Sequence, residues 1–296
     1  RAFIDPDRPD DVHRARLVAI KRDLVATISP SATGVMLEPE LSIPDVLDVL
    51  APGVGFIAAL EAQGYLSDPG ATATTLFWPV QEAVATGADA VKLLVPYHPD
   101  HELAAAQRVV AAAVVDECRT VGIPIVLEPL FHSLATPADR ERVVLTTVDH
   151  FAGTGADLLK LPFPVDPDLT TDVDRRTEAC TRVTERCDQP WALLSGGGSF
   201  ESFAAQVEVA AAAGAAGFMV GRALWGEAAR ADEIDRAAII TQVVLPRWNH
   251  LAQCVEPRVV PRVEHRAEPR VAPHAEPRAE SREPIRATLD AEPSTH

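Results

Sequence analysis

Short apolar segments alternate with longer alanine-rich segments along most of the chain, and this alternation constrains the fold more than any other feature. Most of the apolar segments are continuous, without polar alternation, which is typical of strands buried on both faces. Seven segments are predicted to be strands: Gly34–Leu37, Gly55–Ala59, Ala90–Pro96, Pro124–Leu127, Asp157–Phe163, Trp191–Ser195 and Gly217–Gly221. Their starts recur every 21 to 35 residues, which leaves room for a helix between neighbours and predicts a parallel sheet.

Helical patterns fill the intervals between these strands, for example at Glu102–Val121 and Phe200–Ala213. Glycines follow where several helices should end, since glycine readily adopts the left-handed conformation of a helix C-cap. These are Gly87, Gly122, Gly155 and Gly214. A strand–helix repeat of this kind predicts a (β/α)8 TIM barrel.

The eighth strand of such a barrel is not found in the sequence. Arg1–Pro9, which precedes a helix expected at Asp11–Ser29, is too short and proline-rich to form it. We therefore expect a barrel that lacks its first strand in this chain, with that strand lost or placed before residue 1. An open doubly wound sheet is the alternative, but the chain has no Gly-x-Gly-x-x-Gly fingerprint.

Two regions of different composition divide the chain of 296 residues. Residues 1–253 carry the strand–helix repeat and have a suitable length for one barrel domain. Residues 254–296 repeat Glu-Pro-Arg three times and contain few large apolar side chains. Because such a segment buries too little apolar surface to offset its ordering entropy, we expect a disordered tail, either passive or used for docking.

The charge balance argues against nucleic acid and acidic membranes as partners. Lys and Arg total 27 against 43 Asp and Glu, a net charge of −16, which repels phosphate backbones. The four cysteines form no Cys-x-x-Cys pair, and no apolar run has the roughly 20 residues of a membrane span. We expect a cytoplasmic protein, and the sequence leaves its oligomeric state open, a homo-oligomer included.

Lysine is rare in this chain, which draws attention to Lys160. Only Lys21, Lys92 and Lys160 occur, beside 24 arginines. Lys21 lies among other charged residues, where a solvated surface role accounts for it. Lys160 lies in an apolar strand near its carboxyl end, which is the active face of a barrel. Burial lowers the pKa of an amine, and a neutral lysine is a nucleophile toward carbonyls that arginine does not replace. A structural ion pair, or a side chain that reaches the rim, is the alternative.

Two further charged residues lie in or directly after predicted strands. Lys92 has the same character as Lys160, and its positive charge would lower the pKa of a neighbouring lysine. Glu128 directly follows the strand predicted at Pro124–Leu127, at its carboxyl end, where a carboxylate is able to move protons on a substrate hydroxyl. An ion pair between Lys92 and Glu128 is the alternative for both. Glu38 occupies a similar place but receives no firm role.

Glycines and an arginine follow the last two predicted strands. Ser195, Gly196 and Gly197 come after one of them, and Gly221 and Arg222 after the other. Phosphate sites of barrels are commonly built from these two loops, because glycines let backbone N–H groups approach the anion. Arg222 would add a charge-assisted contact. A plain tight turn and a surface arginine are the alternative.

Histidines after strand ends raise the question of a metal. His98, His101 and His132 lack the carboxylate-and-histidine spacing of a metal site such as His-Glu-x-x-His. We expect them to be loop residues, and we predict neither a metal nor any other cofactor.

The order of these motifs resembles that of the tagatose-1,6-bisphosphate aldolase family, which includes the sulfofructosephosphate aldolases and belongs to the class I barrel aldolases. The motifs run from Val35 to Trp225, and the most specific is Ala213-Gly-Ala-Ala-Gly-Phe-Met-Val-Gly-Arg-Ala-Leu-Trp. The resemblance implies a (β/α)8 barrel in which Lys160 forms a Schiff base, Glu128 is the acid/base residue and Lys92 assists. It also implies that Ser195, Gly196, Gly197, Gly221 and Arg222 hold a substrate phosphate.

The activity implied by the resemblance is that of a metal-independent carbon–carbon lyase. The enzyme would reversibly cleave a phosphorylated ketose, tagatose-1,6-bisphosphate-like or sulfofructose-1-phosphate-like, to dihydroxyacetone phosphate and an aldehyde. The family has an active-site aspartate in an Asp-Gln-Arg segment that would precede residue 1, and often a glutamate where Pro162 stands. These departures leave two alternatives: a catalytically silent sugar-phosphate-binding barrel, and another Schiff-base enzyme such as a deoxyribose-phosphate aldolase or a transaldolase-like enzyme.

Overall fold

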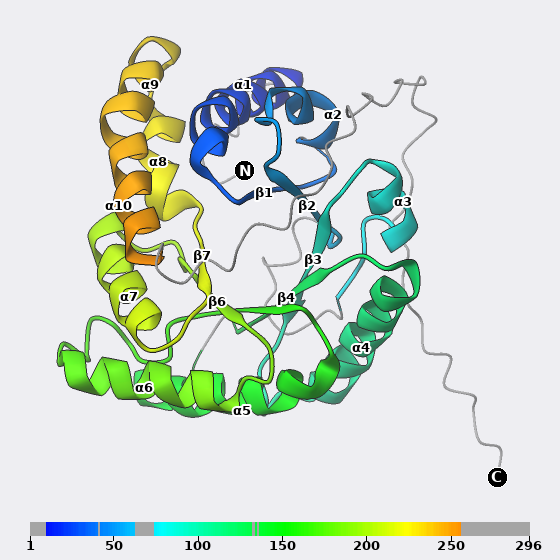
Figure 1. Ribbon diagram of the computed structural model, residues 1–296, viewed down its shortest axis with the longest axis vertical. Coiled ribbons are helices and arrows are strands. Elements are labelled where there is room, and N and C mark those ends of the chain that lie inside the picture. Colours follow the sequence, from blue (N-terminus) through cyan, green and yellow to red (C-terminus); the bar gives the residue numbers. More distant parts are fainter. Residues whose placement is uncertain (1–9, 41, 63–73, 132–133, 135, 256–296) are drawn as a thin grey trace.

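A single sheet of seven parallel strands forms the centre of the computed structural model (Figure 1), with strand order β1 to β7 following the sequence. The structure describes residues 10–40, 42–62, 74–131, 134 and 136–255. The strands are β1 Gly34–Leu37, β2 Gly55–Ala59, β3 Ala90–Pro96, β4 Ile125–Leu130, β5 Leu158–Leu161, β6 Trp191–Leu194 and β7 Gly217–Met219. All seven predicted strands are confirmed, with small shifts at their ends.

Helices surround the curled sheet on its outside, as Figure 1 shows. The helices are α1 Asp10–Ile28, α2 Ile43–Val46, α3 Val80–Ala85, α4 Ala104–Val121, α5 Arg140–Phe151, α6 Val173–Arg186, α7 Phe200–Ala212, α8 Arg222–Arg230, α9 Glu233–Ile239 and α10 Leu245–Val255. A π-helical turn at Ile240–Val244 joins α9 to α10. The predicted stop glycines Gly87, Gly122, Gly155 and Gly214 all have positive φ, from 73° to 107°. This arrangement confirms the barrel-type fold rather than the doubly wound alternative.

The two edges of the sheet, β1 and β7, are not bonded to each other in the described structure. The helical layer is nevertheless continuous there, because α1 packs on α8 and on the π-helical turn. Ile20 and Leu24 of α1 share a buried cluster with Leu224 and Ala228 of α8 and with Val244. Helix packing therefore closes the ring of helices where strand pairing does not.

Two aspartates fix the amino ends of neighbouring strands. Asp89 accepts a hydrogen bond from the backbone N–H of Phe56 at 2.7 Å, and Asp157 accepts one from Ile125 at 2.9 Å. Each aspartate follows Gly-Ala and directly precedes its own strand, β3 or β5. Each carboxylate thus accepts a hydrogen bond from the backbone of the preceding strand, β2 or β4, and so fixes where the following strand, β3 or β5, begins.

Strand β5 illustrates how the core positions the polar residues. Leu159 and Leu161 are 0% and 1% exposed, and burial of a leucine side chain contributes about 1.5–3 kcal/mol. Successive side chains of a strand point to opposite faces, so these two leucines direct Lys160 to the other face of β5. A one-residue shift of register would reverse all three, and the hydrophobic core therefore fixes the direction of Lys160.

The last described helix ends just beyond the boundary expected at residue 253, since α10 extends to Val255. Most of the predicted tail, residues 256–296, lies outside the described residues. Across the part of the chain that the structure describes, no helix is both long and apolar enough to span a membrane.

Candidate active site

Four charged side chains, three from consecutive strands and one from the segment just after β2, meet inside the curled sheet. Lys92 lies on β3, Glu128 on β4 and Lys160 on β5, while Glu61 follows β2 directly after Leu60. All four residues are between 3% and 8% exposed. Charged groups at this depth need partners, and here two amines and two carboxylates compensate one another.

Lys160 and Glu128 form the first contact of this cluster. The Nζ atom of Lys160 lies 2.8 Å from Oε1 of Glu128. Burial lowers the pKa of Lys160 below its usual value; Glu128 opposes this shift and the positive charge of Lys92 adds to it. Lys160 is therefore an amine that loses its proton more easily than an exposed lysine. This agrees with the nucleophile hypothesis and not with a side chain that reaches the rim.

Lys92 differs from Lys160, although both are buried lysines on neighbouring strands. Its Nζ lies 2.9 Å from Oε2 of Glu128 and also contacts Oε1 of Glu61. Burial alone would lower the pKa of Lys92, but the two carboxylates raise it above its usual value. The structure thus contains the Lys92–Glu128 ion pair that the sequence left open, and a protonated Lys92 lowers the pKa of Lys160 as expected.

Glu128 bridges the two lysines with its two carboxylate oxygens. Burial alone would raise the pKa of Glu128, yet Lys92 and Lys160 hold that pKa below its usual value. The strand register explains the position, because Glu128 of β4 pairs with Leu94 of β3. The carboxylate therefore reaches Lys92 diagonally across the ladder, within the range of long side chains.

Glu61 is the residue of this cluster that sequence reasoning missed. A signal was available, since Glu61 is a charged residue placed directly after the apolar run that forms β2. The carboxylate contacts Lys92 with one oxygen, and its other oxygen accepts a hydrogen bond from the backbone N–H of Leu94 at 3.2 Å. Glu61 is thus attached to β3 twice.

Lys21 and Glu38 are a correction to the sequence analysis. The sequence assigns Lys21 a solvated surface role, but its side chain is only 29% exposed and pairs with Glu38 just after β1. The Nζ of Lys21 also donates to the hydroxyl of Ser42 at 2.6 Å. Each of the three lysines in the chain is thus paired with at least one glutamate.

The predicted phosphate-binding residues come together at the ends of β6 and β7. Gly196 and Gly197 have positive φ, 57° and 83°, a conformation that favours glycine. The Gly221 N–H points to the Ser195 hydroxyl at 3.5 Å. A Cβ at Gly197 would lie 3.4 Å from the guanidinium of Arg222, so the two loops touch. Arg222 begins α8, where helix N–H groups favour an anion.

The candidate metal residues of the sequence behave as turn residues where the structure describes them. His98 and His101 each accept a backbone hydrogen bond through Nδ1, from Asp100 at 3.3 Å and from Leu103 at 3.1 Å. His132 lies outside the described residues.

Another group of potential metal ligands lies on the helical shell. Glu208 of α7 and His250 and Cys254 of α10 place one ligand atom each within 4.8 Å of one another. Glu208 and His250 are exposed, and the thiol of Cys254 donates to the backbone oxygen of His250. Burial and the Glu208 carboxylate raise the pKa of Cys254, which favours the neutral thiol over the thiolate that binds metals. No metal site is inferred there.

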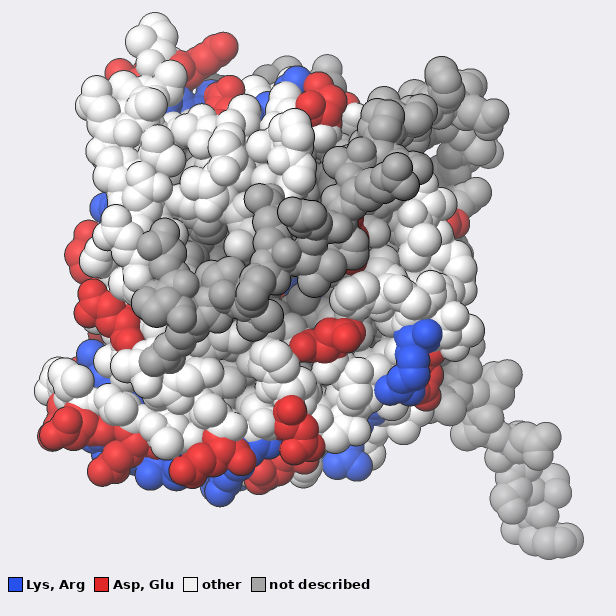
Figure 2. Space-filling model, in the orientation of Figure 1, with Lys and Arg blue, Asp and Glu red and all other residues white. Residues whose placement is uncertain are grey.

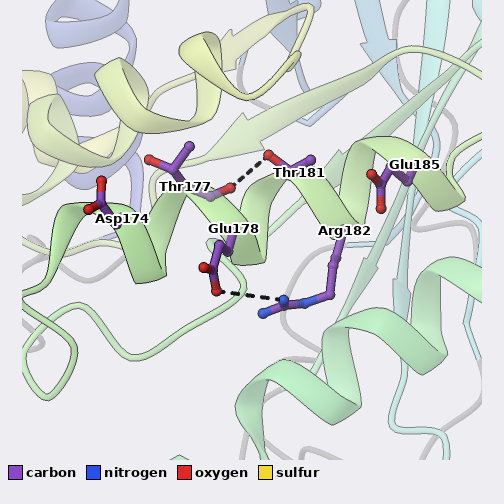
Figure 3. Close-up of a pocket in the computed structure, with 6 residues that line it drawn as sticks. All are labelled: Asp174, Thr177, Glu178, Thr181, Arg182 and Glu185. Atoms are coloured by element: carbon purple, nitrogen blue, oxygen red, sulfur yellow. Dashed lines mark hydrogen bonds and ion pairs between the residues drawn. The ribbon is translucent and has the colours of Figure 1, made fainter.

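The outer surface carries a different kind of polar feature. A depression on α6 is lined by Asp174, Thr177, Glu178, Thr181, Arg182 and Glu185 (Figure 3), all from one helix. Acidic and basic side chains alternate along the α5–α6 edge in Figure 2, where Arg175 and Arg182 of α6 both pair with Glu141 of α5. These contacts join neighbouring helices on the outside of the ring. The buried lysines lie on the sheet and take no part in them.

Comparison with known proteins agrees with this geometry. The family model described as "DeoC/LacD family aldolase" matches residues 10–227. This range includes the strands β1 to β7 and all residues of the buried cluster. The chain belongs to the DeoC/LacD aldolase family. The family resemblance drawn from the sequence motifs is thereby confirmed.

Two proteins of similar sequence carry the name of an aldolase. The chain is 26% identical over 230 residues to a tagatose 1,6-diphosphate aldolase of Listeria monocytogenes, which covers 68% of this chain and 66% of that protein. It is 28% identical over 227 residues to tagatose 1,6-diphosphate aldolase 1 of Streptococcus pyogenes, covering 67% and 68%. The chain thus spans about two thirds of the length of these two relatives.

A solved structure supports the fold. An archaeal fructose 1,6-bisphosphate aldolase matches 85% of this chain and 86% of its own, with a TM-score of 0.59 at 20% identity. At that identity the likeness establishes the barrel-type architecture alone.

Proposed function

We propose that this member of the DeoC/LacD family is a class I aldolase that reversibly cleaves a phosphorylated ketose to dihydroxyacetone phosphate and an aldehyde. One observation carries the proposal. Lys160 is a buried amine whose pKa is lowered, and it lies 2.8 Å from a carboxylate that is able to exchange protons. A nucleophilic amine and an acid/base group in contact are the minimum that imine chemistry needs.

The first half of the reaction builds the imine. Neutral Lys160 attacks the ketose carbonyl carbon through Nζ, and the carbonyl oxygen gains a proton to give a carbinolamine. Loss of water from that carbon then leaves a protonated imine. Glu128, which lies 2.8 Å from Lys160, is placed to take the proton that Lys160 loses before the attack and to give it to the departing hydroxyl. Lys92 keeps its proton between two carboxylates, and its positive charge favours the neutral form of Lys160.

The second half breaks the carbon–carbon bond. Glu128 takes the proton of the C4 hydroxyl, the C3–C4 bond breaks, and its electron pair moves into the iminium to form an enamine. The aldehyde leaves with C4. Protonation of C3 and addition of water then release dihydroxyacetone phosphate and restore the Lys160 amine. The iminium thus accepts the electron pair, and the reaction requires no metal.

The phosphate of the ketose would be held by Ser195, Gly196, Gly197, Gly221 and Arg222. Support comes from the contact between the two loops, since Arg222 lies against Gly197. Backbone N–H groups of the glycine loop and of the first turn of α8 provide uncharged donors, and Arg222 adds a positive charge. This pairing would place the phosphate at the ends of β6 and β7, the strands that follow the Lys160 strand in the sheet.

The substrate is proposed to be tagatose-1,6-bisphosphate-like or sulfofructose-1-phosphate-like. The names of the Listeria and Streptococcus relatives support a ketose bisphosphate. Pro162 stands two residues after Lys160, where the family often has a glutamate. A substrate panel should therefore vary the group at the end of the sugar that is opposite the 1-phosphate.

A product assay tests this function directly. The purified full chain is incubated with tagatose 1,6-bisphosphate, fructose 1,6-bisphosphate, sulfofructose 1-phosphate and deoxyribose 5-phosphate, and dihydroxyacetone phosphate is measured with a coupled dehydrogenase. We expect release from at least one ketose phosphate, unchanged by EDTA and abolished in Lys160→Met.

Two results would contradict the proposal. Calorimetric binding of these sugars without turnover would favour the silent sugar-phosphate-binding barrel. Cleavage of deoxyribose 5-phosphate alone, detected as acetaldehyde, would indicate a different Schiff-base reaction. Arg119→Met is the matched control for loss of a positive charge in Lys160→Met, because Arg119 is an exposed residue of α4.

A further inference from the structure

Glu61 is held in place more firmly than an ordinary ion-pair partner. Its carboxylate contacts the Lys92 amine with Oε1 and accepts the Leu94 backbone N–H with Oε2. Its backbone forms an antiparallel bridge with Leu76. The N–H of the preceding residue, Leu60, donates to the carbonyl of Lys92 at 2.9 Å. The carboxylate is therefore fixed relative to β3 by side chain and backbone together.

The buried cluster is asymmetric because of this residue. Lys92 contacts two carboxylates, Glu61 and Glu128, whereas Lys160 contacts Glu128 alone among the residues that the structure describes. Glu61 and Glu128 act on both amines, and the positive charge of Lys92 acts in addition on Lys160. Without Glu61, the two lysines would share one carboxylate on nearly equal terms.

We propose that Glu61 is a positioning residue that selects the nucleophile, because it holds the proton on Lys92 and leaves Lys160 as the amine that becomes neutral. This inference rests on the proposed function, since it concerns which lysine attacks the ketose. Glu61 acts through Lys92 and does not itself touch the substrate.

The expected effect of Glu61→Gln follows from the charges. The amide keeps the shape of the side chain but removes one negative charge beside Lys92. An opposite charge in contact shifts a pKa by about one to three units, so the titration midpoint of Lys92 should fall by about that amount. The midpoint of Lys160 should fall less, because Glu61 acts on that amine only at a distance. The midpoints of Lys92 and Lys160 should then lie closer together, and the neutral amine should be divided between the two residues.

The scarcity of lysine allows a direct measurement. The full chain contains three lysines, so labelling with lysine that carries ¹³C at Cε gives three resonances whose shifts follow the protonation of each amine. Lys21→Arg and Lys92→Arg variants assign the signals. The titration is recorded for the unchanged protein, for Glu61→Gln and for Asp116→Asn, an exposed change that removes the same charge elsewhere.

We expect Lys160 to titrate below Lys92 in the unchanged protein and in Asp116→Asn, and the Lys92 midpoint to fall by about one to three pH units in Glu61→Gln. We also expect kcat to fall in Glu61→Gln while KM changes little, because the phosphate-binding loops remain. A Lys92 midpoint that does not move would overturn the inference. So would a Lys92 midpoint at or below that of Lys160 in the unchanged protein, a result that requires no variant to fold.

Failure of the inference and failure of the proposed function give different results. If borohydride traps no adduct on Lys160 with dihydroxyacetone phosphate, the proposed function fails whatever the order of titration. If the adduct forms on Lys160 but Glu61→Gln leaves the Lys92 midpoint and kcat unchanged, the role of Glu61 alone is refuted.

Discussion

Replacement of Glu128 by glutamine tests the buried cluster most severely. Glu128 contacts Lys92 at 2.9 Å and Lys160 at 2.8 Å, and it is 4% exposed. The amide preserves the shape but leaves two buried amines without their shared charge. Removing one partner of a buried ion pair typically costs about 3–5 kcal/mol. We expect about 3 kcal/mol for Glu128→Gln, because the amide oxygen still accepts hydrogen bonds.

Urea unfolding at pH 7 measures this effect. With a slope of about 3 kcal/mol per M for a domain of this size, the midpoint should fall by about 1 M. Glu227→Gln is the matched control, since Glu227 is 51% exposed and pairs with Arg247 on the surface. The control should change the free energy of unfolding by less than about 0.5 kcal/mol.

The pH dependence identifies the cause of the loss. In Glu128→Gln, burial without the carboxylate lowers the pKa of Lys160 further below its unfolded value of about 10.4. The unfolded state then binds more protons than the folded state as pH rises, so the stability of the variant increases with pH. The difference in free energy of unfolding between Glu128→Gln and the unchanged protein should therefore become smaller between pH 7 and pH 9.5. A difference below about 1 kcal/mol at pH 7, or one that is independent of pH, would refute the reasoning.

Further predictions concern the phosphate-binding loops and the nucleophile. Arg222→Ala should raise KM for the phosphorylated ketose by about 10- to 100-fold with kcat little changed, because a hydrogen bond to a charged group contributes about 1.5–3 kcal/mol; steady-state kinetics check this, and an unchanged KM would contradict it. Gly197→Ala should also raise KM and lower the melting temperature, since φ is +83° there and the new Cβ would approach Arg222 to 3.4 Å. Because Lys160 must lose its proton, the rate of borohydride trapping should rise with pH and reach half its maximum below the usual lysine pKa of about 10.4; a midpoint at or above that value would count against a lowered pKa.

Much of the fold is readable from the sequence because it depends on local patterns. Continuous apolar runs mark strands buried on both faces, and glycines with positive φ such as Gly122 and Gly155 mark helix ends. The convergence of Lys92, Glu128 and Lys160 also follows from the pattern. Charged residues in neighbouring parallel strands lie side by side once the strands pair in sequence order.

The parts that were not predicted depend on register and packing. The contact of Glu61 with Lys92 requires the stagger between β2 and β3, in which Ala59 pairs with Lys92. The pairing of Lys21 with Glu38 depends on how α1 packs over β1, and no pattern within α1 encodes that distance. Asp89 is a third case, because its contact with Phe56 joins residues that are 33 positions apart.

The central claim is that Lys160 is the amine that forms an imine with the substrate, and trapping with borohydride tests it most directly. The full chain is incubated with dihydroxyacetone phosphate, reduced, digested and mapped by mass spectrometry, with Lys160→Met as the comparison. The account predicts one stable adduct per chain, on the peptide that contains Lys160, and none in the variant. An adduct on Lys21 or Lys92 in the unchanged protein, or no adduct at all, would contradict it.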